Sequence, residues 1–386
     1  MSNAASRALR SLERMPRSHE YYDFLYRAVT SPAAQCASTL MSIGPQLLIG
    51  TYTSGRAAIG AYLCALNDGG QVQVRGVCAI DDPSFLIRHP NLPVAYAVNE
   101  SPQGHGGVSV LGIDVPNRRI EVLQRVEAGG EAPCHVALAD DASGLIVAHY
   151  GCGTVQWLGL NASGRLTGES RDIRHKGASA RRRRQASAHP HCVVVRGDHV
   201  YVTDLGMDCI VRYAIDARHG FIERDRTLIH PGAGPRHLCF AKKHAVAYVG
   251  NELDNSVSTL SVADDGTLTE REWCSSLPPG CAERSAIGEV TLHPNGRWLY
   301  ASNRGFDSIV WFNVGADGAL SFADVVSSQG QHPRHFSIAP DGRQLVVANR
   351  DSNNLVSYKI DQRSGALLAP GVVSTDVPAP VCVCWV

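Results

Sequence analysis

The sequence predicts an all-β fold, a seven-bladed β-propeller with four-stranded blades closed by pairing of the N- and C-terminal strands. Three observations indicate it. Strand-like apolar runs that end in a small polar signature recur seven times, 46 to 55 residues apart. Each run is followed by a second apolar run and, after a turn, by a short third strand, and a fourth strand precedes most copies. Four strands per repeat at this period are typical of propellers, because the repeats of a β-solenoid are shorter.

The apolar run that ends in the polar signature aligns the seven copies of the repeat with one another. The signature residues are Thr51, Asn99, His149, Asp204, Asn251, Asn303 and Asn349. A residue type that recurs at one position of a repeat usually serves the scaffold. We therefore expect the four asparagines to make blade-to-blade hydrogen bonds.

Turn signals fall at fixed places in the repeat. They are the pairs Asp265-Gly266, Asn295-Gly296, Asp341-Gly342 and Ser364-Gly365. Such pairs favour tight hairpin turns, which the antiparallel blades of a propeller require.

The two ends of the propeller sequence complement each other. The first repeat has no strand before it, and the last residues, "PVCVCWV", supply one. Pairing of this segment with Gln46–Thr53 would complete the split blade. Such closure removes the exposed edges of an open array.

The chain divides into two parts by composition. Residues 1–45 have helical spacing and Arg/Ser-rich segments, and we expect an N-terminal helical or flexible extension there. It is a dispensable arm, an organellar presequence, or sequence upstream of a later start at Met41. Residues 46–386 form the predicted propeller domain.

The composition excludes several classes of partner. Lys+Arg and Asp+Glu both number 36, so the chain has no basic field for nucleic acid or anionic lipid. No apolar run approaches the ~20 residues of a membrane span. The twelve cysteines form no Cys-x-x-Cys pair, and several lie in apolar strands. We expect reduced, buried cysteines in a cytoplasmic protein, with disulfides in a secreted protein as the alternative.

The innermost strand of each blade lines the channel of a propeller, so the first residues of these strands meet at one face. One channel position is filled by Ser84, Cys134, His191, Arg236, Gly288 and Arg334, and the next by Phe85, His135, Cys192, His237, Glu289 and His335. The ends of the adjacent strands add Glu100, Tyr150, Glu252, Arg304 and Arg350. A His or Arg there can simply bond the backbone of the next blade. However, the residue types differ from blade to blade, which a purely structural ring would not require. Because buried charges are costly unless they are paired, this set of residues indicates a polar ligand.

The residue types indicate the kind of ligand. Several arginines suit a carboxylate or phosphate, and a Glu among Arg and His suits proton transfer. Metal binding is a competing interpretation, with His135, His189, His191, His237 and Glu289 as the conceivable ligands. Interspersed arginines repel a cation and no His-Glu-x-x-His spacing is present, so we predict no metal. No Gly-x-Ser-x-Gly or P-loop pattern occurs.

One segment interrupts the repeat. "RHKGASARRRRQASAHPHC" precedes the innermost strand that carries His191, and it contains four consecutive arginines, Arg181 to Arg184. Such a run is commonly a solvated loop. The alternative is that Arg184 reaches over the channel toward an anionic substrate.

Seven segments, one or more from each blade, resemble a known family, among them "LLIGTYTS", "PGAGPRHLCFA", "AYVGNELDNSVSTL" and "LYASNRGFDSIVWF". They are similar to the lactonase family of seven-bladed propellers, which contains cycloisomerase-type 6-phosphogluconolactonases and fungal carboxymuconate lactonizing enzymes. The resemblance implies hydrolysis of 6-phospho-D-glucono-1,5-lactone in the pentose phosphate pathway, without a required cofactor. His191 (with His189), Arg236, Glu252 and Arg304 match the channel motifs of the family. The chain departs from it at His149, where the family usually has Asn, and in the Arg-rich insertion.

These observations give one working hypothesis for the site. The predicted catalytic residues are His191, Arg236, Glu252 and Arg304, with Glu252 or His191 as the base and the arginines stabilising the oxyanion. The predicted substrate-binding residues are His135, Arg184, His189, His237, Glu289, Arg334 and His335. The expected partner is a small anionic lactone. A muconate-type lactonizing cycloisomerase and a non-enzymatic propeller that binds a partner remain as alternatives.

Overall fold

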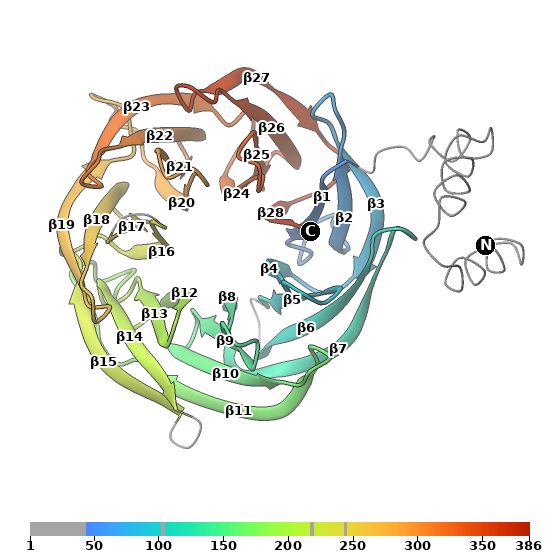
Figure 1. Cartoon of the computed structure of the whole chain (residues 1–386), viewed down its shortest axis with the longest axis horizontal. Coiled ribbons are helices and arrows are strands. Elements are labelled where there is room, and N and C mark those ends of the chain that lie inside the picture. The colour runs from blue at the N-terminus through green and yellow to red at the C-terminus, as the bar shows by residue number, and fades with distance from the viewer. Residues whose placement is uncertain (1–43, 102–104, 217–219, 243–244) are drawn as a thin grey trace, which may run out of the picture. The chain divides into compact units, whose positions relative to one another are not determined.

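The computed structural model describes residues 44–101, 105–216, 220–242 and 245–386, and these form the predicted propeller (Figure 1). All regular elements in these ranges are strands, arranged as seven four-stranded sheets. The compact unit is Pro45–Val386. The extension expected over residues 1–45 falls outside the described residues except for Gly44 and Pro45. None of the described residues belongs to a helix with the length and apolarity that crossing a membrane requires.

The core draws on the three inner strands of each blade, and the third strands are nearly as buried as the second. The innermost strands are β4 (Pro83–Arg88), β8 (Pro133–Leu138), β12 (Pro190–Arg196), β16 (Pro235–Phe240), β20 (Ala286–Leu292), β24 (Pro333–Ile338) and β28 (Pro380–Trp385). The second strands are β1 (Gln46–Thr51), β5 (Val94–Asn99), β9 (Gly144–His149), β13 (His199–Asp204), β17 (Val246–Asn251), β21 (Trp298–Arg304) and β25 (Gln344–Asn349). The second strands are buried almost throughout, which explains their near-continuous apolar sequences.

The third and fourth strands complete each blade. The third strands are β2 (Gly60–Leu66), β6 (His105–Asp114), β10 (Thr154–Leu160), β14 (Cys209–Asp216), β18 (Ser256–Val262), β22 (Ser308–Val314) and β26 (Asn354–Ile360). The fourth are β3 (Val72–Ala79), β7 (Arg119–Glu131), β11 (Leu166–Arg174), β15 (Gly220–Leu228), β19 (Leu268–Ser275), β23 (Leu320–Ser327) and β27 (Leu367–Ser374). The fourth strands are largely exposed, as the outer edge of a blade should be.

The predicted closure of the ring is confirmed. Strand β28 pairs antiparallel with β1, so the last strand of the chain is the innermost strand of the first blade. The register joins Leu48 to Cys384 and Ile49 to Val383. In Figure 1 the red β28 lies beside the blue β1.

Apolar packing between neighbouring blades holds the ring together. Seven buried clusters each combine side chains of two adjacent blades; one, for example, joins Tyr201 and Ile210 to Leu238 and Val249. Buried hydroxyls of second-strand tyrosines also bond the carbonyl of a turn glycine in the next blade, in the pairs Tyr96–Gly164, Tyr201–Gly266, Tyr248–Gly318 and Tyr300–Gly365.

The predicted Gly turns are confirmed. Gly266, Gly296, Gly342 and Gly365 all have positive φ. At Gly266 a Cβ would also lie 2.7 Å from the hydroxyl oxygen of Tyr201. Glycine is therefore required there both for backbone conformation and for space.

The asparagine prediction is confirmed at three of four positions. Asn99, Asn303 and Asn349 donate from Nδ2 to the segment that enters from the preceding blade, at Asp81, Ser276 and Ser328. For Asn251 the prediction is wrong, because its Nδ2 donates to Ser256 and Ser258 of its own blade.

Candidate active site

A β-bulge at the start of each innermost strand creates the site. In β16, Pro235 pairs with Asn251 and His237 with Gly250, which leaves Arg236 without a partner in the ladder. The pairing skips one residue at the same place in six blades, and in β20 it skips Gly288 and Glu289 together with Ser302 of the second strand. A bulge re-aims a side chain, so two consecutive residues of each strand can face the channel. We call the bulged residues the bulge ring (Ser84, Cys134, His191, Arg236, Gly288, Arg334, Val381) and the following residues the floor ring (Phe85, His135, Cys192, His237, Glu289, His335, Cys382).

A cavity of about 290 Å³ opens at this end of the channel. Its lining comes from the bulge ring, from residues that follow the second strands and from the Arg-rich segment: Tyr52, Glu100, Cys134, Tyr150, Arg184, His191, Glu252, Arg304 and Arg334. Five of the predicted site residues therefore meet in one cavity, whereas Arg236 does not line it and contacts the lining residue Glu252. A larger hollow of about 590 Å³ is lined by turns and outer-strand residues, such as Asp140, Trp157 and Arg171, and holds none of them.

Glu252 is the electrostatic centre of the cavity. Its Oε2 lies 2.8 Å from Nη2 of Arg304 and 3.2 Å from Nε of Arg236, and its Oε1 lies 2.5 Å from Nη2 of Arg184. Burial alone would raise the pKa of this carboxyl, but the surrounding guanidinium groups hold it well below its usual range. Glu252 is therefore an ionised carboxylate shared by three arginines.

His191 faces the same carboxylate. Its Nε2 lies 3.9 Å from Oε2 of Glu252, and its Nδ1 lies 3.9 Å from Sγ of Cys134. Burial and the nearby charge of Arg236 hold the pKa of His191 well below its ordinary value. The imidazole is therefore neutral at pH 7 and can accept a proton.

Two buried arginines have unused donors. Nη1 of Arg236 and Nε of Arg304 are buried without a hydrogen-bond partner among the described residues, and Nε of Arg236 has only its ion pair with Glu252. Burial and the neighbouring guanidinium groups of Arg304 and Arg334 lower the pKa of Arg236 to about 10, so it stays charged at neutral pH. Buried donors without acceptors are costly, which is typical of groups that await an anionic ligand.

Arg334 forms the other side of the cavity. Its Nη2 lies 3.6 Å from Oε2 of Glu100, and its guanidinium carbon lies 5.2 Å from the ring centroid of Tyr52. The Tyr52 hydroxyl donates to the same Glu100 oxygen at 2.8 Å. The cavity thus has two charged sides, one built on Glu252 and one on Arg334.

The Arg-rich segment contributes one arginine to the cavity. The side chain of Arg184 is 48% exposed, and besides Glu252 its Nη2 reaches the hydroxyl of Tyr150 at 3.3 Å. His189 does not line the cavity. It stacks on Tyr150 at 4.4 Å and places Nδ1 2.7 Å from the Tyr150 carbonyl oxygen. His189 therefore supports a cavity residue from behind.

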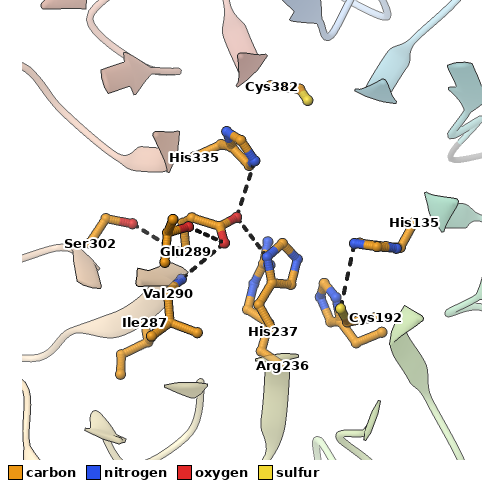
Figure 2. A network of polar contacts seen from close by, with 12 residues as sticks. His135, Cys192, Arg236, His237, Ile287, Glu289, Val290, Ser302, His335 and Cys382 are labelled. Carbon is orange, nitrogen blue, oxygen red and sulfur yellow. Dashed lines mark hydrogen bonds and ion pairs between the residues drawn. The ribbon is translucent and has the colours of Figure 1, made fainter. Parts of the chain in front are cut away.

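No residue of the floor ring lines the cavity. Figure 2 shows His237 and His335 on two sides of Glu289. The Oε2 of Glu289 lies 2.7 Å from Nδ1 of His237 and 3.1 Å from Nε2 of His335. Its Oε1 accepts from the Val290 amide at 3.1 Å. These bonds hold Glu289 inside the fold.

Two floor-ring histidines bond the backbone of the next blade. Nδ1 of His135 accepts the Val193 amide, and Nδ1 of His335 accepts the Val383 amide, each at 3.3 Å. Innermost strands present free N–H groups to the channel, and these side chains satisfy them. Of the seven predicted substrate-binding residues, the structure therefore brings only Arg184 and Arg334 into the cavity.

Sequence reasoning left out several cavity residues. Tyr52 follows the signature residue Thr51, as Glu252 follows Asn251, so the repeat itself carried the signal. Glu100 and Tyr150 were predicted at the ends of the second strands, but no role was assigned to them. Arg350 was predicted in the same set, but it bonds Asp351 and does not line the cavity. Within the described ranges, no three His, Cys, Asp or Glu side chains are grouped as metal ligands would be.

Comparison with known proteins agrees with this architecture. A family model described as "Lactonase, 7-bladed beta-propeller" matches residues 46–385. A 6-phosphogluconolactonase of Bacillus subtilis is 32% identical over 343 residues, which cover 87% of this chain and 96% of that protein. A 6-phosphogluconolactonase of Formosa agariphila is 29% identical over 333 residues, covering 83% and 94%.

Solved structures give the same result. A protein of Lactobacillus plantarum matches with a TM-score of 0.83 at 27% identity, covering 89% of this chain and 99% of that one. The periplasmic gluconolactonase of Pseudomonas aeruginosa matches with a TM-score of 0.79 at 28% identity, over the same shares.

Proposed function

This chain belongs to the lactonase family of seven-bladed β-propellers, and we propose that it hydrolyses 6-phospho-D-glucono-1,5-lactone to 6-phosphogluconate. The observation that carries the proposal is the buried Glu252 carboxylate, which three guanidinium groups surround beside a neutral imidazole. Such a cavity can hold an anionic substrate, stabilise an oxyanion and move a proton.

His191 is the proposed general base. A carboxylate whose pKa is held far below neutrality is a weak base, whereas a neutral imidazole accepts a proton readily. Nε2 of His191 would take a proton from water as the water oxygen attacks the lactone carbonyl carbon. The imidazolium would then return that proton to the ring oxygen as the bond from this oxygen to the carbonyl carbon breaks.

Arg236 and Arg304 are the proposed oxyanion partners. Nη1 of Arg236 and Nε of Arg304 are unpaired donors already fixed in a buried site, so little reorganisation is needed when negative charge develops on the carbonyl oxygen. Glu252 keeps both guanidinium groups in place and stabilises the imidazolium that forms on His191. The catalytic set is thus His191, Arg236, Glu252 and Arg304.

Arg334 is the proposed partner of the substrate phosphate. Its guanidinium pairs with Oε2 of Glu100 at 3.6 Å, beyond hydrogen-bond distance, and both residues line the cavity. Guanidinium groups bind phosphate with charge-assisted, frequently bidentate hydrogen bonds. Glu100 beside it suits the hydroxyls of a sugar chain and disfavours a second carboxylate.

We also propose that the protein works in the cytoplasm. Its eleven described cysteines are free, as expected in a reducing compartment. The Pseudomonas aeruginosa relative is named as periplasmic, so compartment does not follow from family alone.

A panel of lactones tests the function. The purified protein is assayed with 6-phosphogluconolactone, unphosphorylated gluconolactone and a carboxylated muconolactone, with spontaneous hydrolysis subtracted. The phosphorylated sugar lactone should give the highest kcat/KM. Faster conversion of the muconolactone to an open-chain muconate, a reaction that adds no water, would establish the cycloisomerase alternative instead.

A further inference from the structure

Asp208, which directly precedes β14, has a carboxylate that accepts four hydrogen bonds. It is 3% exposed. Its Oδ1 accepts from Nε2 of Gln185 at 2.6 Å and from the Gly234 amide at 2.8 Å. Its Oδ2 accepts from Oγ of Ser179 at 2.5 Å and from the Gly232 amide at 2.7 Å. The donors come from two stretches of chain far apart in sequence.

The first stretch is the Arg-rich segment, residues 179–185. Its two ends bond each other, because the Ser179 amide donates to the Gln185 carbonyl at 2.9 Å. Gln185 is fully buried and also donates from Nε2 to the Leu205 carbonyl at 2.9 Å. Arg184 is the residue beside this anchor, and its guanidinium reaches Glu252. Asp208 therefore holds both ends of the segment that carries Arg184 into the cavity.

The second stretch is the turn 232–234, which leads into Arg236. The Gly234 carbonyl accepts the Glu252 amide at 2.7 Å. Gly232 and Gly234 both have positive φ, so their amides can point toward one carboxylate. The same Asp208 side chain thus also holds the turn on which Arg236 and Glu252 depend.

The equivalent residues of three other blades bond fewer stretches of the chain than Asp208 does. Asn255, Asp307 and Asn353 occupy the same place, with positive φ of 60°, 48° and 53° against 49° for Asp208. Each bonds the backbone that enters the next blade; Oδ1 of Asn353, for example, accepts from the Ala379 amide at 2.9 Å. Of these four residues, Asp208 alone also bonds an inserted segment over the cavity.

We propose that Asp208 is a positioning residue of the active site, which fixes the Arg-rich segment and the turn before Arg236 relative to each other. The expected effect of Asp208 on kinetics rests on the proposed lactonase function, whereas its anchoring of the two stretches does not depend on that function. A carboxylate suits the position because it only accepts hydrogen bonds, and four donors converge on it. An amide would face at least one backbone N–H with its own N–H₂ group.

Hydrogen exchange tests the anchoring without any substrate. In D208N, amides of residues 179–185 should exchange at least ~10-fold faster than in the wild type, because their hydrogen bonds open more often. The matched pair is D208A and N353A, which remove side chains at the same backbone conformation. N353A should leave exchange in 179–185 unchanged. Unchanged exchange in both D208N and D208A would overturn the proposal.

A double-mutant cycle tests the catalytic consequence. D208N should lower kcat/KM about 10-fold or more, and N353A should stay within about twofold of the wild type. Part of the D208N effect acts through Arg184, so it should be at least ~3-fold smaller in an R184A background. Full additivity of the two substitutions would overturn the positioning role. A wild type without lactonase activity would refute the proposed function, while the exchange experiment would still decide the anchoring.

Discussion

Nε2 of His191 and Oε2 of Glu252 face each other across 3.9 Å from neighbouring blades, and three guanidinium groups hold the carboxylate in that position. The arrangement separates two roles that the sequence left open. Glu252 is the fixed anion and His191 is the neutral acceptor.

His191 should give the enzyme a flat pH profile around neutrality. Its pKa is lowered, so the neutral form that accepts a proton persists below the ordinary pKa of histidine, ~6.5. We expect kcat/KM to stay constant from pH 8 down past 6.5 and to fall only at lower pH. Initial rates between pH 5 and 8 measure this, and a fall with a midpoint near 6.5 would show that His191 titrates normally or is not the base.

Replacing Glu252 with Gln should lower kcat/KM by at least ~100-fold, about 3 kcal/mol in transition-state stabilisation. The amide cannot balance the charges of Arg236 and Arg304, whose guanidinium groups then repel each other. The control is E270Q, which alters a partly buried carboxylate that does not line the cavity. Near-wild-type kinetics in E252Q would remove Glu252 from the mechanism.

Arg334 should be needed mainly for substrates that carry a phosphate group. R334A is expected to lower kcat/KM for 6-phosphogluconolactone by ~10- to 100-fold, the usual range for a charged hydrogen bond. For unphosphorylated gluconolactone the loss should be only a few-fold. R350A, in the same blade, changes an arginine that bonds Asp351 and serves as the control. Equal losses for both lactones in R334A would place the phosphate elsewhere.

Glu289 should matter for stability and little for turnover. E289Q leaves a buried hydrogen bond to His237, His335 or Val290 unmade, at a cost of about 1–3 kcal/mol. Denaturant unfolding should show this loss, while kcat/KM should stay within ~3-fold of the wild type, because Glu289 does not line the cavity. A large rise in KM with unchanged stability would return Glu289 to the substrate-binding set.

His230 should make stability depend on pH. Its Nδ1 lies 2.8 Å from Glu270 and its Nε2 lies 2.7 Å from Asp254. Partial burial lowers its pKa, but the hydrogen bonds to the two carboxylates raise it above the ordinary value overall. A raised pKa stabilises the fold below ~6.5 and the benefit disappears as pH rises through the folded-state pKa. H230Q should therefore cost more unfolding free energy at pH 6 than at pH 9; an equal cost at both would contradict the assignment.

The sequence was sufficient for the fold because spacing and turn residues repeat seven times. The cavity was predicted in outline, since His191 and Arg236 lie at the start of innermost strands, and Glu252 and Arg304 lie at the ends of second strands, on three consecutive blades. The division between cavity and floor ring was not predictable. His135 and His335 look like His191 in sequence, and only the three-dimensional register shows that they bond backbone amides of the next blade.

Asp208 was missed for a related reason. Its donors come from residues 179–185 and 232–234, and no local pattern reports that these stretches meet. Tyr52 was missed although the repeat pointed to it. The bulges were not foreseen either, because an alternating strand gives no sign of the skipped residue that turns Arg236 and His237 toward one channel.

The most direct test of the central claim is the hydrolysis rate of 6-phosphogluconolactone at neutral pH for the wild type and H191Q, above the spontaneous rate. The wild type should reach a kcat/KM in the ordinary enzymatic range, ~10⁴ M⁻¹s⁻¹ or more. H191Q should be slower by at least ~100-fold while unfolding at a similar temperature. A wild type that does not exceed the spontaneous rate, or an H191Q variant that matches the wild type, would contradict the account.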